Sequence, residues 1–208
     1  MSKAIVTGCA GFIGSHLCDA LLEEGFRVIG VDNLITGKKA NISHLKKNKS
    51  FEFYKRDIVK GFNARGKIDY VFNLASPASP IDYQRIPIQT ALANSIGTKN
   101  MLDLALKKRA VFLEASTSEV YGDPLEHPQR ETYNGNVNIT GPRACYDESK
   151  RFAEMLCLNY ASVFHLETRI ARIFNTFGPR MRSSDGRVIP NFITQALSNK
   201  PMTVYGSG

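Results

Sequence analysis

The chain has 208 residues, a hydrophobic fraction of 43%, a charged fraction of 22% and a net charge of +8. Such a length can bury one sizeable core, while no apolar run approaches the roughly 18 residues of a membrane span and no signal-peptide pattern is present. The basic residues do not form a recognisable nucleic-acid-binding module, so we expect a basic surface that attracts a small anionic ligand, with no nucleic acid or membrane as partner.

A glycine-rich turn separates the first predicted strand from the first predicted helix. Lys3–Thr7 is a short apolar run typical of a buried parallel strand, and residues 12–24 place their apolar side chains on one helical stripe. Glycines at such a turn let the backbone approach a pyrophosphate, and the helix N-terminus adds unpaired amides and a partial positive charge. The turn therefore predicts a dinucleotide cradle, although its spacing is one residue longer than the commonest fingerprint, and a turn without ligand is the alternative. The residues expected to form the cradle are Gly8, Gly11, Phe12, Ile13 and Gly14.

The second predicted strand ends in an acidic residue that bears on the choice of cofactor. Residues 27–31 are apolar and β-branched, and Asp32 follows them, 18 residues after the last glycine of the turn. A carboxylate at this position accepts hydrogen bonds from the adenine ribose hydroxyls and repels a 2′-phosphate, which favours NAD over NADP. Lys38 and Lys39 weaken this preference, since a lysine can pair with such a phosphate. Asp57 closes the third predicted strand and is a weaker candidate for the adenine amine, because aspartate also begins turns.

Strands and helices alternate along the rest of the chain. Further strands are predicted at residues 50–54, 70–74, 110–115 and 166–174, and helices at 88–107, 146–161 and 191–199. This alternation predicts an α/β fold, a Rossmann-like doubly wound parallel sheet. The four cysteines have neither metal-ligand nor disulfide spacing, so we expect no metal site and free thiols in a cytoplasmic protein.

Tyr146 and Lys150 are four residues apart on a predicted helix and therefore share one of its faces. A free tyrosine titrates near pH 10, too high for a base at neutral pH. A nearby ammonium and a positively charged nicotinamide both favour the phenolate. Tyr146 would then take a proton from a substrate hydroxyl as hydride leaves to NAD, while Lys150 holds the nicotinamide ribose. Because helical Tyr–Lys pairs also arise by chance, this prediction needs support from a second element.

Polar residues follow the strand predicted at 110–115, at the end where open α/β sheets place their sites. Thr117 offers a hydroxyl that can share the substrate proton with Tyr146. Ser118 and Glu119 come next, and a carboxylate is unexpected for the simple oxidation of an alcohol. Glu119 therefore indicates a second step in which a proton, a carbanion or a carboxylate is handled. The alternative is that Glu119 only pairs with a surface lysine.

Four passages of the sequence carry a distinctive pattern. They are residues 73–80 (NLASPASP), 116–124 (STSEVYGDP), 141–150 (GPRACYDESK) and 173–181 (IFNTFGPRM). With these passages the chain resembles, over essentially its whole length, the extended short-chain dehydrogenase/reductases, and among them the UDP-glucuronate decarboxylases (UDP-xylose synthases). Related nucleotide-sugar 4,6-dehydratases carry an aspartate where this chain has Ser118, and related 4-epimerases usually lack a glutamate at the position of Glu119.

The resemblance implies a conversion of UDP-glucuronate to UDP-xylose in which bound NAD is reduced and then reoxidised. Tyr146, supported by Lys150 and Thr117, would deprotonate the 4-hydroxyl as hydride passes to NAD. The resulting ketone lies β to the carboxylate, so carbon dioxide can leave, and Thr117 and Tyr146 would stabilise the enolate. Glu119 and Ser118 would orient the sugar and help to deliver the proton that replaces the carboxylate, before hydride returns.

The resemblance also implies binding residues beyond the glycine turn. For NAD these are Asp32, Asn33, Thr36, Gly37, Asp57, Ile58, Leu74, Ser76, Tyr146, Lys150, Thr176 and Arg187. For the UDP part of the substrate they are Asn175 and Asn191. Three alternatives stay open: a decarboxylase that releases the UDP-4-keto-pentose, another nucleotide-sugar epimerase or dehydratase, and an NAD-binding protein without turnover.

The resemblance further implies a division of the chain and an assembly. Residues 1–175 are expected to form an NAD-binding domain that carries the catalytic residues. Residues 176–208 are expected to begin a smaller substrate-binding part that is truncated, because members of the family continue beyond this point. Family members form homodimers through the helices that correspond to 88–107 and to the helix of Tyr146. The candidate interface residues, which would equally suit a core, are Leu102, Leu106, Phe152 and Leu156.

Overall fold

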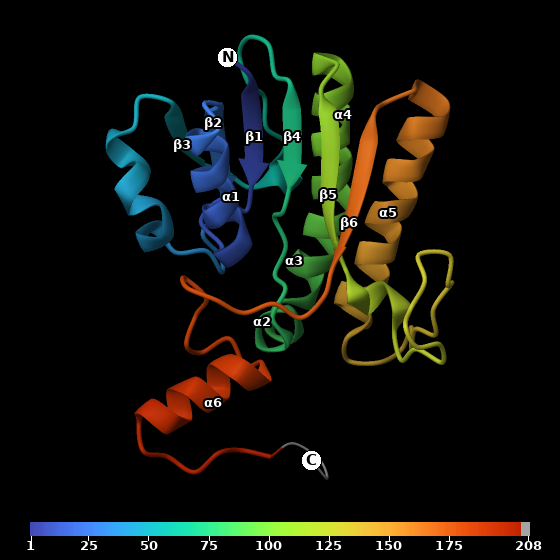
Figure 1. The fold of residues 1–208 in the computed structure, drawn as a ribbon. Coiled ribbons are helices and arrows are strands. Elements are labelled where there is room, and N and C mark those ends of the chain that lie inside the picture. The colour runs from blue at the N-terminus through green and yellow to red at the C-terminus, as the bar shows by residue number, and fades with distance from the viewer. Residues whose placement is uncertain (205–208) are drawn as a thin grey trace.

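The computed structural model describes residues 1–204, and these residues contain a six-stranded sheet. Its strands lie in the order β3-β2-β1-β4-β5-β6, and every neighbouring pair is parallel. The doubly wound α/β sheet predicted from the sequence is therefore confirmed (Figure 1). The strands are β1 (Lys3–Thr7), β2 (Arg27–Asp32), β3 (Phe51–Lys55), β4 (Tyr70–Asn73), β5 (Val111–Thr117) and β6 (Thr168–Ile173).

Helices fill the connections between the strands and follow the last one. Within residues 1–204, none of them combines the length and the apolar character that a membrane crossing needs. The α-helices are α1 (Phe12–Glu23), α2 (Pro80–Arg85), α3 (Pro87–Leu92), α4 (Thr98–Lys108), α5 (Ala144–Phe164) and α6 (Val188–Leu197). The 3-10 helices are η1 (Lys39–Lys47), η2 (Ile58–Lys60) and η4 (Ser118–Tyr121), and a π-helical segment is η3 (Ala93–Gly97).

Two hydrophobic cores lie on opposite faces of the sheet. Successive side chains of a strand point to opposite faces. For that reason β1 contributes Ile5 to the core beneath α4 and α5, and Ala4 and Val6 to the core beneath α1 and η1. A strand that is buried on both faces has a nearly continuous apolar sequence, which explains why the sequence predicts β1 to the residue and β2 to within one residue.

The strand order reverses between β1 and β4. From β1 the chain winds outward through β2 and β3, and it then returns to build β4, β5 and β6 on the other side. Open α/β sheets bind their ligands in the crevice that such a reversal leaves at the carboxyl ends of the strands. Segments that follow β1, β4 and β5 therefore meet at one edge, although they are far apart in the sequence (Figure 1).

The helices before β5 differ from the prediction. The run expected at residues 88–107 consists of α3, the wider π-helical turn η3 and α4. The short helix α2 was not expected, because it has six residues and begins at Pro80, and sequence periodicity needs a longer window. Among the four candidate interface residues, Leu102 is fully buried in the core and only Phe152 is exposed. The other two, Leu106 and Leu156, pack partly buried against that core.

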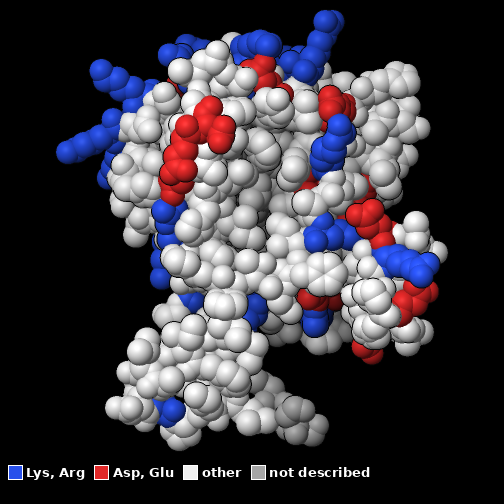
Figure 2. Space-filling view, viewed as in Figure 1, with Lys and Arg blue, Asp and Glu red and all other residues white. Residues whose placement is uncertain are grey.

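After β6 the chain crosses the carboxyl edge of the sheet and reaches α1 (Figure 1). His16 Nε2 lies 3.0 Å from the carbonyl oxygen of Pro179, and Arg180 forms a 2.6 Å ion pair with Asp19. Beyond this crossing, α6 projects away from the sheet. Figure 2 shows few charged side chains around α6, whereas lysines and arginines project from the opposite rim of the same face. The net positive charge is therefore concentrated away from the α6 end of this face.

Candidate active site

Two adjoining cavities lie along the carboxyl edge of the sheet. The larger has a volume of about 330 Å³ and the smaller a volume of about 160 Å³. They have lining residues in common from the glycine turn and from the loops after β2 and β4, so together they form one elongated trough. These common residues are Gly8, Gly11, Thr36, Leu74 and Ser76.

The glycine turn can approach a ligand closely because side chains are excluded from it. Gly8 has a φ of +67°, and a Cβ on this residue would lie 2.7 Å from the carbonyl oxygen of Leu74. A Cβ on Gly14 would collide with the carbonyl oxygen of Gly8. Gly11 is the N-cap of α1 and supplies no side-chain cap, so the first amides of the helix face the trough without an internal partner. This geometry is that of an anion cradle.

Asp32 lies at the end of β2 and lines the smaller cavity. Its two carboxylate oxygens accept hydrogen bonds from Ala10 N (2.9 Å) and Leu34 N (2.7 Å), which fix its orientation. Burial raises the pKa of this carboxyl, and the two backbone donors offset part of the effect. Asp57 also lines the smaller cavity, and its carboxylate accepts a 2.9 Å hydrogen bond from Val59 N at the start of η2. Asp57 therefore both begins a turn and reaches the trough.

Two chain segments carry the predicted catalytic residues into the larger cavity. Tyr146 and Lys150 come from the first turns of α5 and are 5% and 3% exposed. Thr117 ends β5, and its Oγ1 accepts a 3.2 Å hydrogen bond from Glu119 N, which starts η4 and turns Ser118 and Glu119 toward the same cavity. Thr117 at the end of β5 therefore lines the same cavity as Tyr146 and Lys150 of α5.

Lys150 is held by a partner that the sequence reasoning missed. Its Nζ donates hydrogen bonds to Glu114 Oε1 at 3.0 Å and to the carbonyl oxygen of Ala115 at 2.7 Å. Burial lowers the pKa of Lys150, but the adjacent Glu114 carboxylate, together with Tyr146 and Cys157, outweighs this effect, so the pKa is raised. The signal that would have revealed this partner is a glutamate inside an otherwise apolar central strand.

A second missed contact is an aromatic stack against the ring of Tyr146. The rings of Tyr83 and Tyr146 lie 5.0 Å apart between centroids with an interplanar angle of 3°. Tyr83 is 2% exposed and belongs to the unexpected helix α2. Cys145 Sγ donates a 3.4 Å hydrogen bond to the carbonyl oxygen of Tyr83, which ties α2 to the start of α5. The stack fixes the plane of the Tyr146 ring.

The carboxylate of Glu119 pairs with Arg143, directly before α5, and not with a surface lysine. Both residues line the larger cavity. Arg143 Nε also lies 3.8 Å from Asp147 Oδ2. The guanidinium of Arg143 therefore lies close to two carboxylates, those of Glu119 and Asp147.

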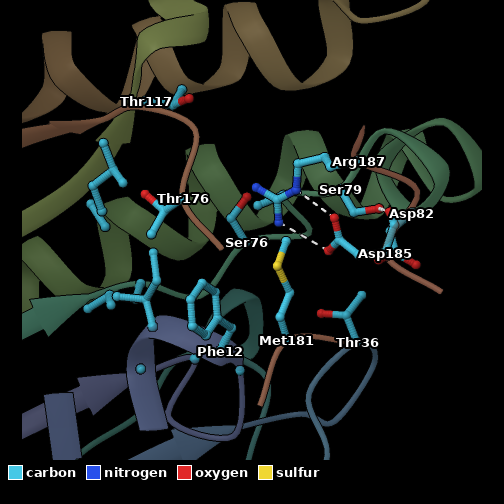
Figure 3. A pocket seen from close by; sticks show the side chains of 18 of the residues that line it. Phe12, Thr36, Ser76, Ser79, Asp82, Thr117, Thr176, Met181, Asp185 and Arg187 are labelled. Atoms are coloured by element: carbon cyan, nitrogen blue, oxygen red, sulfur yellow. Dashed lines mark hydrogen bonds and ion pairs between the residues drawn. The ribbon is translucent and has the colours of Figure 1, made fainter. Parts of the chain in front are cut away.

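The segment after β6 closes the cavity on the side facing α2. Arg187 reaches toward the middle of the space and pairs with Asp185 through Nε (2.5 Å) and Nη2 (3.0 Å), beside Ser76 (Figure 3). Asn175 and Thr176 line the same cavity. Asn191 lines neither cavity, and its Nδ2 donates a 3.1 Å hydrogen bond to the carbonyl oxygen of Gly186.

Every residue predicted for catalysis or cofactor binding lines one of the two cavities, and Asn191 is the exception among the substrate candidates. Their individual roles stay predictions. Among residues 1–204, no group of three or more His, Cys, Asp or Glu side chains is arranged to hold a metal ion.

Comparisons with known proteins agree with this arrangement. The sequence model of the NAD dependent epimerase/dehydratase family matches residues 4–208. The chain belongs to this family. It is 53% identical over 206 residues to UDP-glucuronic acid decarboxylase 1 of Arabidopsis thaliana, covering 99% of this chain and 47% of that protein. UDP-glucuronic acid decarboxylase 1 of Xenopus tropicalis is equally similar, with 53% identity, 99% of this chain and 48% of that protein covered.

A solved structure supports the same family. The UDP-glucuronic acid 4-epimerase from Bacillus cereus in complex with NAD superposes with a TM-score of 0.82 at 33% identity, covering 99% of this chain and 66% of that one. The chain spans about half the length of the two decarboxylases. Membership of the NAD dependent epimerase/dehydratase family therefore rests on sequence and fold together.

Asp147, which follows Tyr146 on α5, gives the stability of the fold a pH dependence. The residue is 6% exposed, and its Oδ1 is buried without a hydrogen-bond partner. Burial raises its pKa from 3.8 to about 6, although Arg143 acts in the opposite direction. Because the folded state binds this proton more tightly than the unfolded state, the contribution of Asp147 to the free energy of unfolding falls as pH rises from about 4 to above 6.

We expect Asp147→Asn to raise the free energy of unfolding by about 1–3 kcal/mol near pH 7.5, because it removes this buried charge. The gain should shrink as pH falls from above 6 to about 4, and it should be absent below about 4, where the carboxyl is protonated in both states. Thermal unfolding followed by circular dichroism across this pH range measures the effect. Glu167→Gln is the control, since the Glu167 side chain is 57% exposed and does not act on Asp147. An equal gain at both ends of the range would contradict the assignment.

Proposed function

We propose that this member of the family binds NAD and converts UDP-glucuronate to UDP-xylose through a 4-keto intermediate. The observation that carries the proposal is the meeting of Thr117, Ser118 and Glu119 with Tyr146 and Lys150 in one cavity beside the glycine turn. The 53% identity to two UDP-glucuronic acid decarboxylases supports it. Oxidation of an alcohol requires only the hydroxyl-bearing residues, so the carboxylate of Glu119 favours a further step on the sugar.

The trough fits an extended dinucleotide. Because Gly8 and Gly14 lack a Cβ, the backbone of the turn packs closely against Leu74 and against the start of α1. The amides at the start of α1 would bind the pyrophosphate. Asp32 would accept hydrogen bonds from the adenine ribose, with Asp57 and Ile58 lining the adenine end of the smaller cavity. Bound there, NAD supplies a hydride acceptor for the oxidation and a hydride donor for the final reduction.

Tyr146 is the proposed base for the 4-hydroxyl of the sugar. Its ring is fixed by the stack on Tyr83, and Lys150 lies one helical turn away on the same face of α5. Thr117, which lines the same cavity, shares the transferred proton. Tyr146 holds the proton while the sugar carries a ketone and returns it to the 4-oxygen when the ketone is reduced.

Decarboxylation follows from the position of that ketone. The ketone lies β to the carboxylate, so the electrons of the breaking carbon–carbon bond move onto the ketone oxygen as carbon dioxide leaves. Tyr146 and Thr117 donate hydrogen bonds to this oxygen. Glu119, oriented by Arg143, and Ser118 position the sugar and support the delivery of a proton to the carbon that lost the carboxylate. A serine hydroxyl is a poor acid for expelling water, which disfavours a 4,6-dehydratase.

We also propose that the chain is divided into two functional parts. Residues 1–175 form the NAD-binding and catalytic part, and the residues that follow begin the substrate-binding part, of which 205–208 lie outside the described residues. Asn175 and Asn191 are the proposed contacts of the UDP group. The separation of α6 from the sheet in Figure 1 supports this division.

Proton NMR of UDP-glucuronate with the protein and NAD tests the proposed reaction. We expect the signals of UDP-xylose to appear without net formation of NADH, because the cofactor is regenerated in each cycle. Accumulation of UDP-4-keto-pentose with one equivalent of NADH would instead indicate decarboxylation without the final reduction. The proposal fails for this chain when NAD binds and UDP-glucuronate is not converted.

We further propose a homodimer formed through α3 and α5. Asn94 Nδ2 of η3 donates a 3.0 Å hydrogen bond to Ser149 Oγ, so this helical run packs beside α5. Both helices carry large apolar side chains on the outside, namely Ile88, Leu92 and Ile96 on α3 and η3, and Phe152 and Met155 on α5. Apolar side chains grouped on adjacent helices are typical of a protein interface.

Size-exclusion chromatography with light scattering is expected to give twice the chain mass of 23.1 kDa. Phe152→Asp combined with Met155→Asp should give the mass of one chain, because two charges would be buried in the interface. Leu125→Asp is the matched control, since Leu125 is an exposed apolar residue that lies outside α3 and α5. A wild-type protein with the mass of one chain would exclude the dimer.

We also propose a cytoplasmic location, supported by the state of the cysteines. All four are free, and Cys9, Cys18 and Cys157 are buried. Burial raises the pKa of the Cys18 thiol to about 12, which keeps it unreactive. Unpaired thiols of this kind persist in a reducing compartment.

A further inference from the structure

Glu114 is a fully buried carboxylate at the centre of the sheet. It lies in β5, has an exposed fraction of 0%, and neighbours Asn73 of β4 in the strand register. Asn73 is in turn the register neighbour of Thr7 in β1. Three adjacent strands therefore carry polar side chains at one level of a sheet that is otherwise packed with apolar residues. A buried carboxylate is costly unless it is paired, so its partners indicate its purpose.

Hydrogen bonds connect this polar row from the glycine turn to the catalytic helix. Thr7 Oγ1 donates to Asn73 Oδ1 at 2.8 Å, and Asn73 Nδ2 donates to Glu114 Oε2 at 2.7 Å. The other oxygen of Glu114 accepts the 3.0 Å hydrogen bond from Lys150 Nζ. Thr7 Oγ1 also accepts hydrogen bonds from the amides of Leu74 and Ala75, which form the wall of the trough. The row therefore joins the cofactor wall to the ammonium of Lys150.

The geometry of an ammonium group explains what this row achieves. A lysine Nζ has three donors. Two of them are committed to Glu114 Oε1 and to the carbonyl oxygen of Ala115. The third donor of Lys150, which lines the larger cavity, is thereby directed toward that space. Without Glu114 the long side chain would keep only the carbonyl as an anchor.

We propose that Glu114 is a positioning residue that keeps the Lys150 ammonium charged and aims its free donor at the cofactor. This inference rests on the proposed function in one respect, namely that Lys150 contacts bound NAD. Glu114 itself contacts neither the cofactor nor the substrate in this assignment, since it lies behind Lys150 in the sheet. It acts on the ligand only through the lysine.

The charges around Lys150 support this assignment. Burial alone would lower the pKa of the lysine, and the Glu114 carboxylate is the largest of the interactions that raise it again, so that the pKa is raised overall. The other groups that act on the charge of Lys150 are the phenol of Tyr146 and the thiol of Cys157, both from α5, and neither is a carboxylate that could replace Glu114. The nearby carboxylates have other partners, since Glu154 pairs with Arg172, and Glu119 and Asp147 lie beside Arg143.

Calorimetric titration with NAD tests the inference in Glu114→Leu and Glu114→Gln proteins. We expect NAD binding to weaken by about tenfold to a hundredfold near pH 7, because the lysine loses a charge-assisted hydrogen bond that orients it. The loss should grow as pH rises, since a buried ammonium without a counter-charge releases its proton at lower pH. Wild-type affinity should change little over the same range.

A double-mutant cycle separates positioning from a purely structural role. In a Lys150→Met background, Glu114→Leu is expected to change the NAD affinity by no more than about twofold, because the residue it acts through is gone. The double variant lacks both the Glu114 carboxylate and the Lys150 ammonium, so neither charge is left buried without its partner. We therefore expect it to fold more readily than the single Glu114 variants. An equal loss of affinity in both backgrounds would overturn the inference.

Lysine side-chain NMR provides a second readout that needs no cofactor. In protein labelled with ¹⁵N-lysine, the Lys150 ammonium signal is assigned by its absence in Lys150→Met. We expect this signal to persist to high pH in the wild type and to vanish at lower pH in Glu114→Gln. An unchanged signal in Glu114→Gln would overturn the inference even where NAD binding, and with it the proposed function, fails.

Glu154→Gln is the matched control for both measurements. Glu154 is another buried carboxylate next to the same helix face, but it pairs with Arg172 (2.7 Å) and accepts a hydrogen bond from Ser116. Its replacement should lower thermal stability and leave both the NAD affinity and the Lys150 signal unchanged. A Glu154→Gln protein with the same loss of affinity as Glu114→Gln would show that any buried ion pair has this effect, which contradicts a specific positioning role.

Discussion

Replacing Tyr146 with phenylalanine is expected to lower the rate of UDP-glucuronate conversion by about 10²- to 10⁴-fold. The change removes the oxygen that we propose takes the proton of the 4-hydroxyl, and it keeps the ring that stacks on Tyr83. NAD affinity should stay close to the wild-type value, because Lys150 and the glycine turn are unchanged. The NMR assay gives the rate, and calorimetry gives the affinity.

Tyr83→Phe is the matched control, since it makes the same chemical change in the other ring of the stack. The rings would remain 5.0 Å apart and nearly parallel, so we expect a rate close to the wild-type value. A Tyr146→Phe protein that converts UDP-glucuronate at the wild-type rate would exclude Tyr146 as the base. A rate loss of equal size in both variants would assign the effect to the stack.

Gly14→Ala is expected to weaken NAD binding by about tenfold to a hundredfold and to lower the free energy of unfolding by about 1–3 kcal/mol. The added Cβ would collide with the carbonyl oxygen of Gly8 and lie 3.1 Å from Cys9 Cα. All the atoms that it meets belong to the backbone of the turn, so relief requires the turn itself to move. Calorimetry with NAD and thermal unfolding measure the two effects.

Gly66→Ala provides the comparison for this prediction. Gly66 has a φ of +76°, and a Cβ there would meet nothing within 4 Å, so only backbone strain of about 1–2 kcal/mol is expected. NAD affinity should be unchanged because the residue lines neither cavity. If Gly14→Ala binds NAD as tightly as Gly66→Ala does, then the turn is not the pyrophosphate cradle.

The fold was largely predictable because its signals are local. Strands buried on both faces have apolar sequences bounded by glycine or polar residues, as in β1, and long helices such as α5 repeat their apolar side chains every three to four residues. Elements without these signals were not predicted. Helix α2 is too short to show a period, and the π-helical turn η3 arises where Gly97 packs against Ile58, a contact between distant parts of the sequence.

The candidate site was predictable where the residues that define a motif, and the chemistry that the motif suggests, lie within one short segment of the sequence. The glycine turn, Asp32 and the Tyr146–Lys150 pair are of this kind. Partners brought together by packing were missed. Nothing in the local sequence indicates that Glu119 meets Arg143 or that Tyr146 stacks on Tyr83, because each pair joins elements whose positions depend on the whole fold.

The sequence by itself determined the class of fold, the family resemblance and the residues that carry hydroxyl, ammonium and carboxylate groups toward the sheet edge. Periodicity and spacing contain that information, since both depend on neighbours along the chain. Only the tertiary structure decided which groups share a cavity and which partners control their charge. Glu114 illustrates the difference, because a glutamate in a strand is an anomaly in the sequence, whereas in the folded sheet it is the counter-charge of Lys150. Parallel strands connect residues far apart in the chain, and electrostatic interactions in a buried site depend on those distances.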